Sequence, residues 1–196
     1  SMVWQNLLSY SDEGLEDVEV NGERYLADSD YRPEAVIGQA FGTDLDEDSY
    51  NQVLAETITD AQQLYGKDVE VFVQEEIAEC LDEELREDVF VAGEVYEDEE
   101  DSHMVSKYST KEMFELHHEN IGREGLDPGN VVYVSHPAHM ERVKGIGDKI
   151  GFDGRPFVRS EVEWPSEDSQ PWVRSPLHWG PRELAARSFR KLRGEM

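Results

Sequence analysis

The sequence has a single cysteine, no long apolar run and few basic residues, and each shortage excludes a class of protein. One cysteine, Cys80, cannot form an internal disulfide, and such scarcity is typical of a protein in a reducing compartment. No apolar segment approaches the roughly 20 residues that a membrane-spanning helix needs, and no signal peptide opens the chain. We therefore expect a cytoplasmic protein that does not bind a membrane.

The shortage of basic residues leaves a large negative charge. The chain carries 45 Asp and Glu against 18 Lys and Arg, a formal net charge of −27. Such a charge keeps a protein hydrated in concentrated salt but destabilises it by self-repulsion in dilute salt. We therefore expect a halophilic, salt-adapted protein, the alternative being an acidic protein that binds a partner. Because the same charge repels phosphate backbones, we do not expect nucleic acid as a partner.

The few basic residues are concentrated toward the end of the sequence. Residues 1–136 hold 36 acidic and 7 basic residues, whereas residues 137–196 hold 9 acidic and 11 basic residues. A local group of arginines can attract an anion even when the rest of the surface is negative. The distribution therefore predicts an anionic small molecule as the partner, without indicating a cofactor or an oligomeric state.

Helix and strand patterns alternate along most of the chain. Asn21-Gly22 between alternating flanks predicts a hairpin over 17–26. The 3.6-residue period over 49–66 predicts a helix that begins with a capping box formed by Ser49 and Gln52. The remaining patterns predict strands at 34–40, 69–73, 88–93, 130–135 and 156–160, an acidic helix around 77–85, an acidic loop at 94–107, and helices that begin at 109, after 135 and at 181.

This order of elements predicts an α/β protein with a three-layer, Rossmann-like fold. We expect a mainly parallel sheet of about five strands with helices on both faces, plus the N-terminal hairpin. The length fits a single domain over 1–196. Its expected parts are the hairpin extension (1–30), the core (31–160), and an aromatic loop with a C-terminal helix (161–196). Ligands of such sheets bind beyond the carboxyl ends of the strands.

The segment SHPAHMER (135–142) is the best candidate site, because it follows a buried strand and begins a helix. We expect the first-turn N–H groups to face a ligand, with Arg142 binding charge and Ser135 donating a hydrogen bond. His136 and His139 are candidate catalytic residues, since imidazole exchanges protons near neutral pH. The alternative is that His136 caps the strand end and Arg142 makes a surface ion pair.

Two other segments are predicted to reach the same edge of the sheet. The turn GQAFG contributes Gly38, Gln39 and Gly42 as candidate ligand contacts. Its two glycines permit close approach of the backbone to a ligand, although the turn is not a dinucleotide-binding fingerprint. Thr110 follows Ser109 at a predicted helix start. The pair is expected first of all to cap the helix, and contact with a ligand is the second possible role.

A metal site and a lid are further possibilities. His136 and His139 are three residues apart, but zinc needs three or four protein ligands, and His117-His118 lie on another predicted helix. We therefore predict no metal. For the aromatic and Pro-rich segment 163–183 there are two interpretations. It forms a lid or a wall of the binding site, or it packs across the end of the sheet.

The stretch VVYVSHPAHMERVKGIGDKIGF (131–152) and the order of elements resemble the domain-of-unknown-function family typified by YdcF, SanA and ElyC. Ser135, His139 and Arg142 match its strand-to-helix motif, Thr110 matches a Thr at the preceding helix start, and Gly38 or Gly42 matches its first glycine. The resemblance, over about 34–192, implies a small Rossmann-like domain with a nucleotide-like small molecule as ligand or a role in envelope biogenesis.

These observations favour a small-molecule-binding enzyme that acts on an anionic or nucleotide-like ligand. One alternative is a non-catalytic binding or regulatory module, which is favoured by Lys107 and Met113 where the family usually has Ser and Asn. A less favoured alternative is a metal-assisted hydrolase.

Overall fold

The computed structural model describes residues 14–45, 49–93, 95–97, 104–106, 108–165, 170 and 173–175. The helix predicted from Pro181 and much of the aromatic segment lie outside the described residues. The helices are α1 (Tyr50–Tyr65), α2 (Glu75–Ala78), α3 (Glu83–Arg86), α4 (Thr110–Arg123) and α5 (Pro137–Ile150). The strands are β1 (Glu16–Val20), β2 (Glu23–Ala27), β3 (Ala35–Gly38), β4 (Glu70–Gln74), β5 (Val89–Ala92), β6 (Val95–Glu97), β7 (Met104–Ser106), β8 (Val131–Val134) and β9 (Gly154–Arg159).

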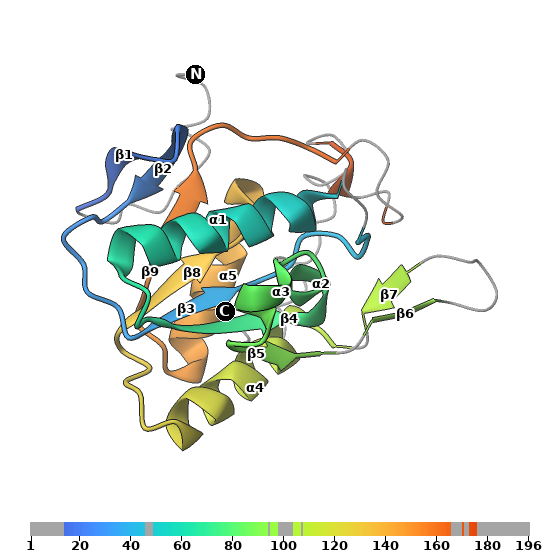
Figure 1. Ribbon diagram of the computed structural model, residues 1–196. Coiled ribbons are helices and arrows are strands. Elements are labelled where there is room, and N and C mark those ends of the chain that lie inside the picture. Colours follow the sequence, from blue (N-terminus) through green and yellow to red (C-terminus); the bar gives the residue numbers. More distant parts are fainter. Residues whose placement is uncertain are drawn as a thin grey trace.

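Seven strands form one mainly parallel sheet in the order β1-β2-β9-β8-β3-β4-β5 (Figure 1). The five strands from β9 to β5 run parallel, and the order of the chain reverses between β3 and β8. The prediction of about five strands was wrong because the N-terminal hairpin is part of the sheet. Its second strand pairs antiparallel with β9, where Tyr25 lies opposite Arg159 and Leu26 opposite Val158.

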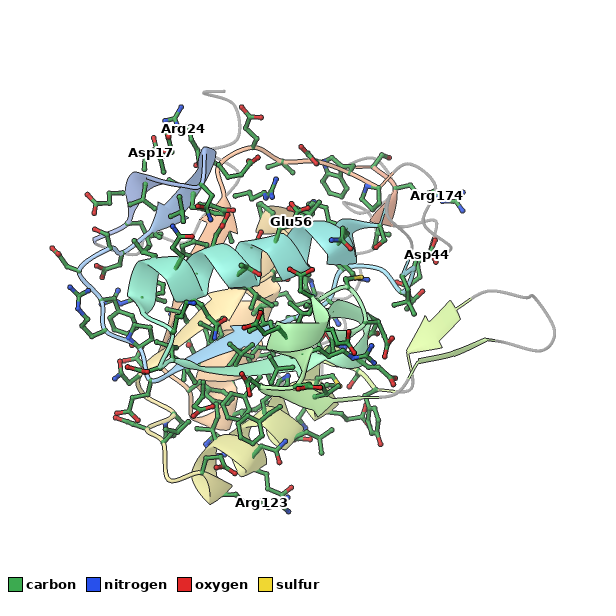
Figure 2. All side chains as sticks on the ribbon, viewed as in Figure 1. Asp17, Arg24, Asp44, Glu56, Arg123 and Arg174 are labelled. Atoms are coloured by element: carbon green, nitrogen blue, oxygen red, sulfur yellow. The ribbon has the colours of Figure 1, made fainter. Side chains whose placement is uncertain are left out.

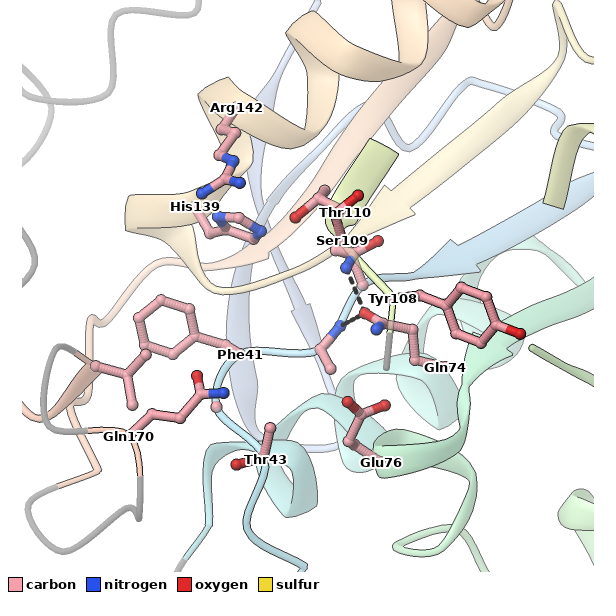
Figure 3. A pocket seen from close by; sticks show the side chains of 14 residues that line it. Phe41, Thr43, Gln74, Glu76, Tyr108, Ser109, Thr110, His139, Arg142 and Gln170 are labelled. Atoms are coloured by element: carbon pink, nitrogen blue, oxygen red, sulfur yellow. Dashed lines mark hydrogen bonds between the residues drawn. The ribbon is translucent and has the colours of Figure 1, made fainter. Parts of the chain in front are cut away.

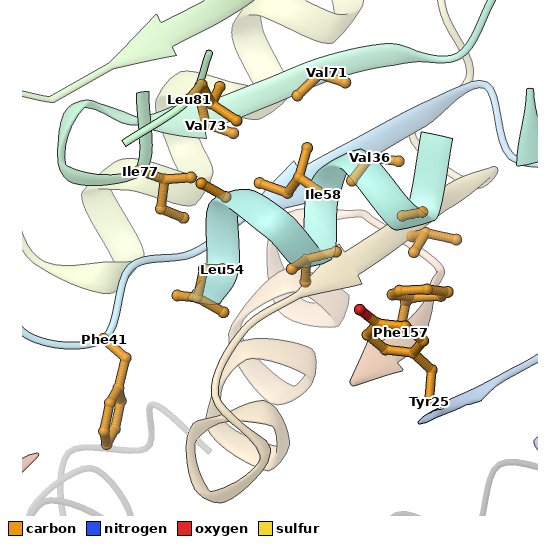
Figure 4. Packing of buried hydrophobic residues seen from close by; sticks show 14 of the residues in the cluster. Tyr25, Val36, Phe41, Leu54, Ile58, Val71, Val73, Ile77, Leu81 and Phe157 are labelled. Atoms are coloured by element: carbon orange, nitrogen blue, oxygen red, sulfur yellow. The ribbon is translucent and has the colours of Figure 1, made fainter. Parts of the chain in front are cut away.

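Helices cover both faces of the sheet, as the sequence predicted. On one face, α1 and α2 pack on alternate strand residues such as Val36, Val71 and Val132 (Figure 4). On the other face, α4 and α5 cover the intervening residues, among them Ile37 and Tyr133. Strand residues that are buried on both faces explain why the parallel strands read as continuous apolar runs.

Several local predictions are confirmed. Asn21 and Gly22 both adopt positive φ angles, 53° and 87°, as a tight hairpin turn requires. Gly66 ends α1 with a φ of 120°. At the start of α4, the Ser109 hydroxyl accepts from the Glu112 amide while the Glu112 carboxylate accepts from the Ser109 amide.

Three local predictions were wrong. Ser49 makes no side-chain hydrogen bond at the start of α1, so the predicted capping box is absent there. The acidic helix around 77–85 is two short helices, α2 and α3. The segment predicted as an acidic loop contains β6 and β7, which pair as a two-stranded ribbon that stands away from the main sheet (Figure 1).

Among the residues that the structure describes, no helix combines the length with the apolar character needed to cross a bilayer.

Candidate functional site

A cavity of about 260 Å³ lies at the carboxyl edge of the parallel strands, where the chain order reverses (Figure 3). Its walls come from the segments that follow β3 and β4, from the starts of α4 and α5, and from the region around 170–173. The lining residues are Gln39, Ala40, Phe41, Gly42, Thr43, Gln74, Glu76, Tyr108, Ser109, Thr110, His139, Arg142, Gln170 and Val173. Polar side chains predominate, so the cavity offers many hydrogen-bonding groups to a polar ligand.

The α5 wall supplies an imidazole and a guanidinium to the cavity. His139 lies in the first turn of α5 and is only 4% exposed, and Arg142 follows one turn later. Residues three apart on a helix share a face, so both side chains reach the same hollow (Figure 3). The structure therefore brings together the imidazole and the guanidinium that the sequence singled out.

The other candidate catalytic residue, His136, lies outside the cavity lining and is fully buried. Its Nε2 donates to the carbonyl of Glu163 at 2.8 Å, and its Nδ1 accepts from the amide of Ala138 at 3.0 Å. Its ring stacks on Phe41 at 3.9 Å between centroids. Burial lowers the pKa of His136 to about 3, against a smaller opposing effect of the Glu163 carbonyl. These contacts favour a structural role over catalysis: His136 caps the start of α5 as a neutral imidazole, whereas the alternative from the sequence had it cap the end of the strand.

The amide donors expected at the start of α5 are already used. Pro137 has no N–H, the Ala138 amide donates to His136 Nδ1, and the amides of His139 and Met140 donate to the His136 carbonyl. The expectation that these groups face a ligand was therefore wrong. The physical reason is that His136 supplies both a side-chain and a backbone cap.

The start of α4 forms a second wall, to which Tyr108, Ser109 and Thr110 contribute. Its capping box engages the amides of Ser109 and Glu112 and leaves those of Thr110 and Lys111 as the remaining first-turn donors. The Glu112 carboxylate adds a negative charge at this helix start, and its hydrogen bonds from Ser109 lower its pKa. Among the lining residues, Arg142 carries the positive charge, with the His139 imidazole beside it.

The loop after β3 lines the cavity and is held firmly by neighbouring elements. The fully buried Asn51 accepts from the Phe41 amide and donates to the carbonyls of Gly42 and Asp44. The Gln39 amide donates to the Val134 carbonyl at the end of β8. Gln39 and Gly42 therefore occupy the predicted place, on a loop whose shape is set before any ligand binds.

Gly38 does not line the cavity, although the sequence suggested it as a ligand contact. A Cβ built at this position would lie 2.7 Å from Ile58 Cδ1 and 2.9 Å from Val73 Cγ1. The glycine is needed because α1 and β4 pack directly against β3 at this point. Its role in the structure is packing, not access for a ligand.

Ser135 directly follows β8 but is also absent from the lining. It is 2% exposed, and its hydroxyl has no hydrogen-bond partner in the part of the chain that the structure describes. The structure thus places Ser135 next to the site without bringing it to the cavity surface.

Two lining residues, Gln74 and Glu76, were missed by the sequence argument. Gln74 is the last residue of β4 and Glu76 lies in α2, the start of the segment in which the sequence predicted an acidic helix. In the structure Gln74 Oε1 accepts from the Ala40 amide at 2.7 Å, and Glu76 is buried at 1% exposure. The strand-end rule would have found them if it had been applied to every parallel strand.

The four histidines that the structure describes do not form a metal-binding cluster. His117 packs edge-on against Phe72 and Phe114 in the core between α4 and the sheet, away from His136. Within the described ranges, no group of three or more His, Cys, Asp or Glu side chains has the geometry to hold a metal ion. The residues at these positions therefore give no support to the metal-assisted alternative.

The described residues of the aromatic segment have two roles: one packs against neighbouring aromatic rings, and others line the cavity. Trp164 packs against Phe41 and His136, with ring centroids 5.8 Å and 4.6 Å apart respectively. Gln170 and Val173 reach the cavity. Trp172, His178 and Trp179 lie outside the described residues.

Comparisons with protein-family models, with curated proteins and with solved structures found no match to this chain. The resemblance to the YdcF, SanA and ElyC family therefore stays a prediction from the sequence.

Proposed function

We propose that this chain binds a small anionic, nucleotide-like ligand in the cavity at the carboxyl edge of its sheet. The observation that carries the proposal is the convergence of His139 and Arg142 on one cavity together with the start of α4. A guanidinium, an imidazole and helix N-terminal amides form charge-assisted hydrogen bonds to phosphate or carboxylate groups.

The fold supports the same proposal. Counted along the chain, the five parallel strands have the spatial order 3-2-1-4-5, which is the order of Rossmann-like domains. In those domains ligands bind where the strand order reverses, and the cavity lies at that point between β3 and β8. We propose a Rossmann-like domain related to the YdcF family on these grounds and on the Ser135, His139 and Arg142 motif.

The size of the cavity limits the ligand. About 260 Å³ is slightly below the roughly 300–1,000 Å³ of sites for drug-sized molecules. This volume favours a single nucleotide fragment or a phosphorylated metabolite over a dinucleotide. The position of His136 outside the lining removes one of the two expected catalytic groups, so the contacts support ligand binding more directly than turnover.

Titration of the full chain with adenosine monophosphate and with inorganic phosphate tests the proposal. The double variant His139→Gln, Arg142→Gln removes the imidazole and the guanidinium, and each lost hydrogen bond to a charged ligand group weakens binding by about 1.5–3 kcal/mol. We expect Kd to rise at least about tenfold, and the ligand-induced rise in Tm to disappear.

Arg123→Gln is the matched control, because it removes one guanidinium charge from the exposed end of α4. Arg123 pairs with Glu119 and lies well away from Asp44, which follows the loop that lines the cavity (Figure 2). Equal affinity of the wild type and the double variant would refute the site. Turnover of phosphoesters by the wild type but not by the double variant would favour the enzyme over the binding module.

A further inference from the structure

Two buried glutamine side chains meet in the cavity wall that the segment after β3 and the end of β4 form. Gln39 and Gln74 are each 3% exposed, and both line the cavity. Two hydrogen bonds converge on Gln74 Oε1, one from the Ala40 amide at 2.7 Å and one from Gln39 Nε2 (Figure 3). The pair therefore ties the loop after β3 to the end of the neighbouring strand.

These two bonds fix the orientation of both side-chain amides. The Gln74 atom that meets the Ala40 amide must be the oxygen, because a backbone N–H can only donate. The Gln39 atom that meets the same oxygen must then be the nitrogen, since only the nitrogen of an amide donates. Gln39 Nε2 is thus engaged by Gln74, and Gln39 Oε1 needs a donor from elsewhere.

No such donor comes from the described part of the chain. Gln39 Oε1 is withdrawn from solvent and has no hydrogen-bond partner among the described residues. The hydroxyl of Ser135, which follows the adjacent strand β8, has no partner there either, so it does not serve Gln39. A buried acceptor without a donor is uncommon, because its lost bond to water is not replaced. Since Gln39 is part of the cavity wall, a bound molecule can supply the missing donor.

We infer that Gln39 is a specificity-determining residue whose Oε1 accepts a hydrogen bond from an N–H or O–H group of the ligand. The inference rests on the proposed function, since it concerns the same cavity and adds a second point of recognition to the anionic group. In a nucleotide-like ligand the donor is either an N–H of the base or a hydroxyl of the sugar. A ligand without such a donor leaves Gln39 Oε1 buried and unpaired, so it binds less tightly.

Pairs of nucleotides that differ by one donor group, with no added bulk, test this inference by calorimetric titration. Adenosine and inosine 5′-monophosphates, each compared with purine riboside 5′-monophosphate, test an N–H of the base. Adenosine 5′-monophosphate compared with its 2′-deoxy and 3′-deoxy analogues tests the two sugar hydroxyls. We expect one comparison to show at least about tenfold tighter binding of the nucleotide that carries the donor. The comparison that does so identifies the source of the donor.

Gln39→Met is the informative variant, because it keeps the length of the side chain and removes the acceptor. We expect it to reduce the preference for the donor to less than about threefold. Gln39→Asn, which keeps an amide but withdraws it by one methylene group, should lose the preference too and replaces the Met variant if that protein does not fold. Gln63→Met is the matched control, because Gln63 is exposed on α1 outside the cavity lining, and it should keep the full preference.

The possible failures are distinguishable. If no pair differs in affinity for the wild type while Arg142→Gln weakens all the nucleotides, water satisfies Gln39 Oε1 and the inference is wrong, but the anion site stands. If one pair differs and a folded Gln39 variant keeps the preference, the donor is recognised elsewhere and the inference is equally wrong. If no nucleotide binds the wild type, the proposed function fails, and the inference fails with it.

Discussion

His117 offers the sharpest test of the fold, because it is a fully buried histidine in the core between α4 and the sheet. Neither of its ring nitrogens has a hydrogen-bond partner among the residues that the structure describes. Burial lowers its pKa from 6.5 to about 4. The neutral imidazole is therefore tolerated in the folded protein, whereas the imidazolium is not.

The size of the effect follows from this difference in pKa. As the pH falls below about 6.5, the unfolded chain binds a proton at His117 that the folded chain refuses until about pH 4. The free energy of unfolding therefore decreases as the pH falls through this window. At about 1.4 kcal/mol per pH unit, the total loss from His117 is about 3 kcal/mol.

The variant His117→Leu isolates this contribution. It removes the titrating group and the two unpaired nitrogens, so it should be more stable than the wild type at neutral pH by about 1–3 kcal/mol. Below about pH 6.5 its advantage should grow by about 1.4 kcal/mol per pH unit. Urea unfolding at fixed, high KCl concentration measures both quantities. The many surface carboxylates and the buried His136 are common to both proteins, so their effects cancel in the difference.

Phe114→Leu is the matched control on the same helix, since it changes an apolar side chain that packs against His117 and does not titrate. It should lower the free energy of unfolding by a similar amount at every pH. A constant difference between wild type and His117→Leu across the window would refute the argument, because it would mean that His117 is solvated or hydrogen-bonded in the folded protein.

Two further predictions concern packing and salt. Gly38→Ala places a methyl group 2.7 Å from Ile58 and should lower the free energy of unfolding by about 1–3 kcal/mol without changing Kd for phosphate probes. Gly145→Ala, in open space on α5, should instead raise the free energy of unfolding by up to about 1 kcal/mol. Equal effects of the two variants in urea unfolding would contradict the packing role of Gly38. The net charge of −27 predicts that Tm rises with KCl as the Debye length falls from about 10 Å at 0.1 M to about 3 Å at 1 M, and a Tm that is independent of KCl would count against salt adaptation.

The elements that the sequence predicted well are those in which one pattern decides the structure. The strands β4 and β8 are continuous apolar runs because both faces of the sheet are covered, and Asn21-Gly22 allows few alternatives to a tight turn. The attachment of the hairpin to β9 was not predictable, because it depends on long-range contacts. Tyr25 donates to the buried Asp60 on α1, and no local pattern signals such a pair.

The candidate site was predicted in part for a related reason. His139 and Arg142 share a helix with a clear beginning, so their common face follows from their spacing. The role of His136 depends on the Glu163 carbonyl and on Phe41, which are distant in sequence. The burial of Glu76 at the cavity could not be predicted, because composition does not distinguish one buried carboxylate from the many that face solvent.

The charge of the whole protein and the charges of the cavity act over different distances. If the protein works in concentrated salt, the field of its −27 charge is screened within a few ångströms and neither repels nor attracts an approaching anion over a longer range. Recognition must then come from groups that touch the ligand in a small, partly enclosed space, where screening ions do not enter. Arg142 and His139 are groups of that kind. Affinity for an anionic ligand should therefore depend on these two side chains far more than on the total number of basic residues in 137–196.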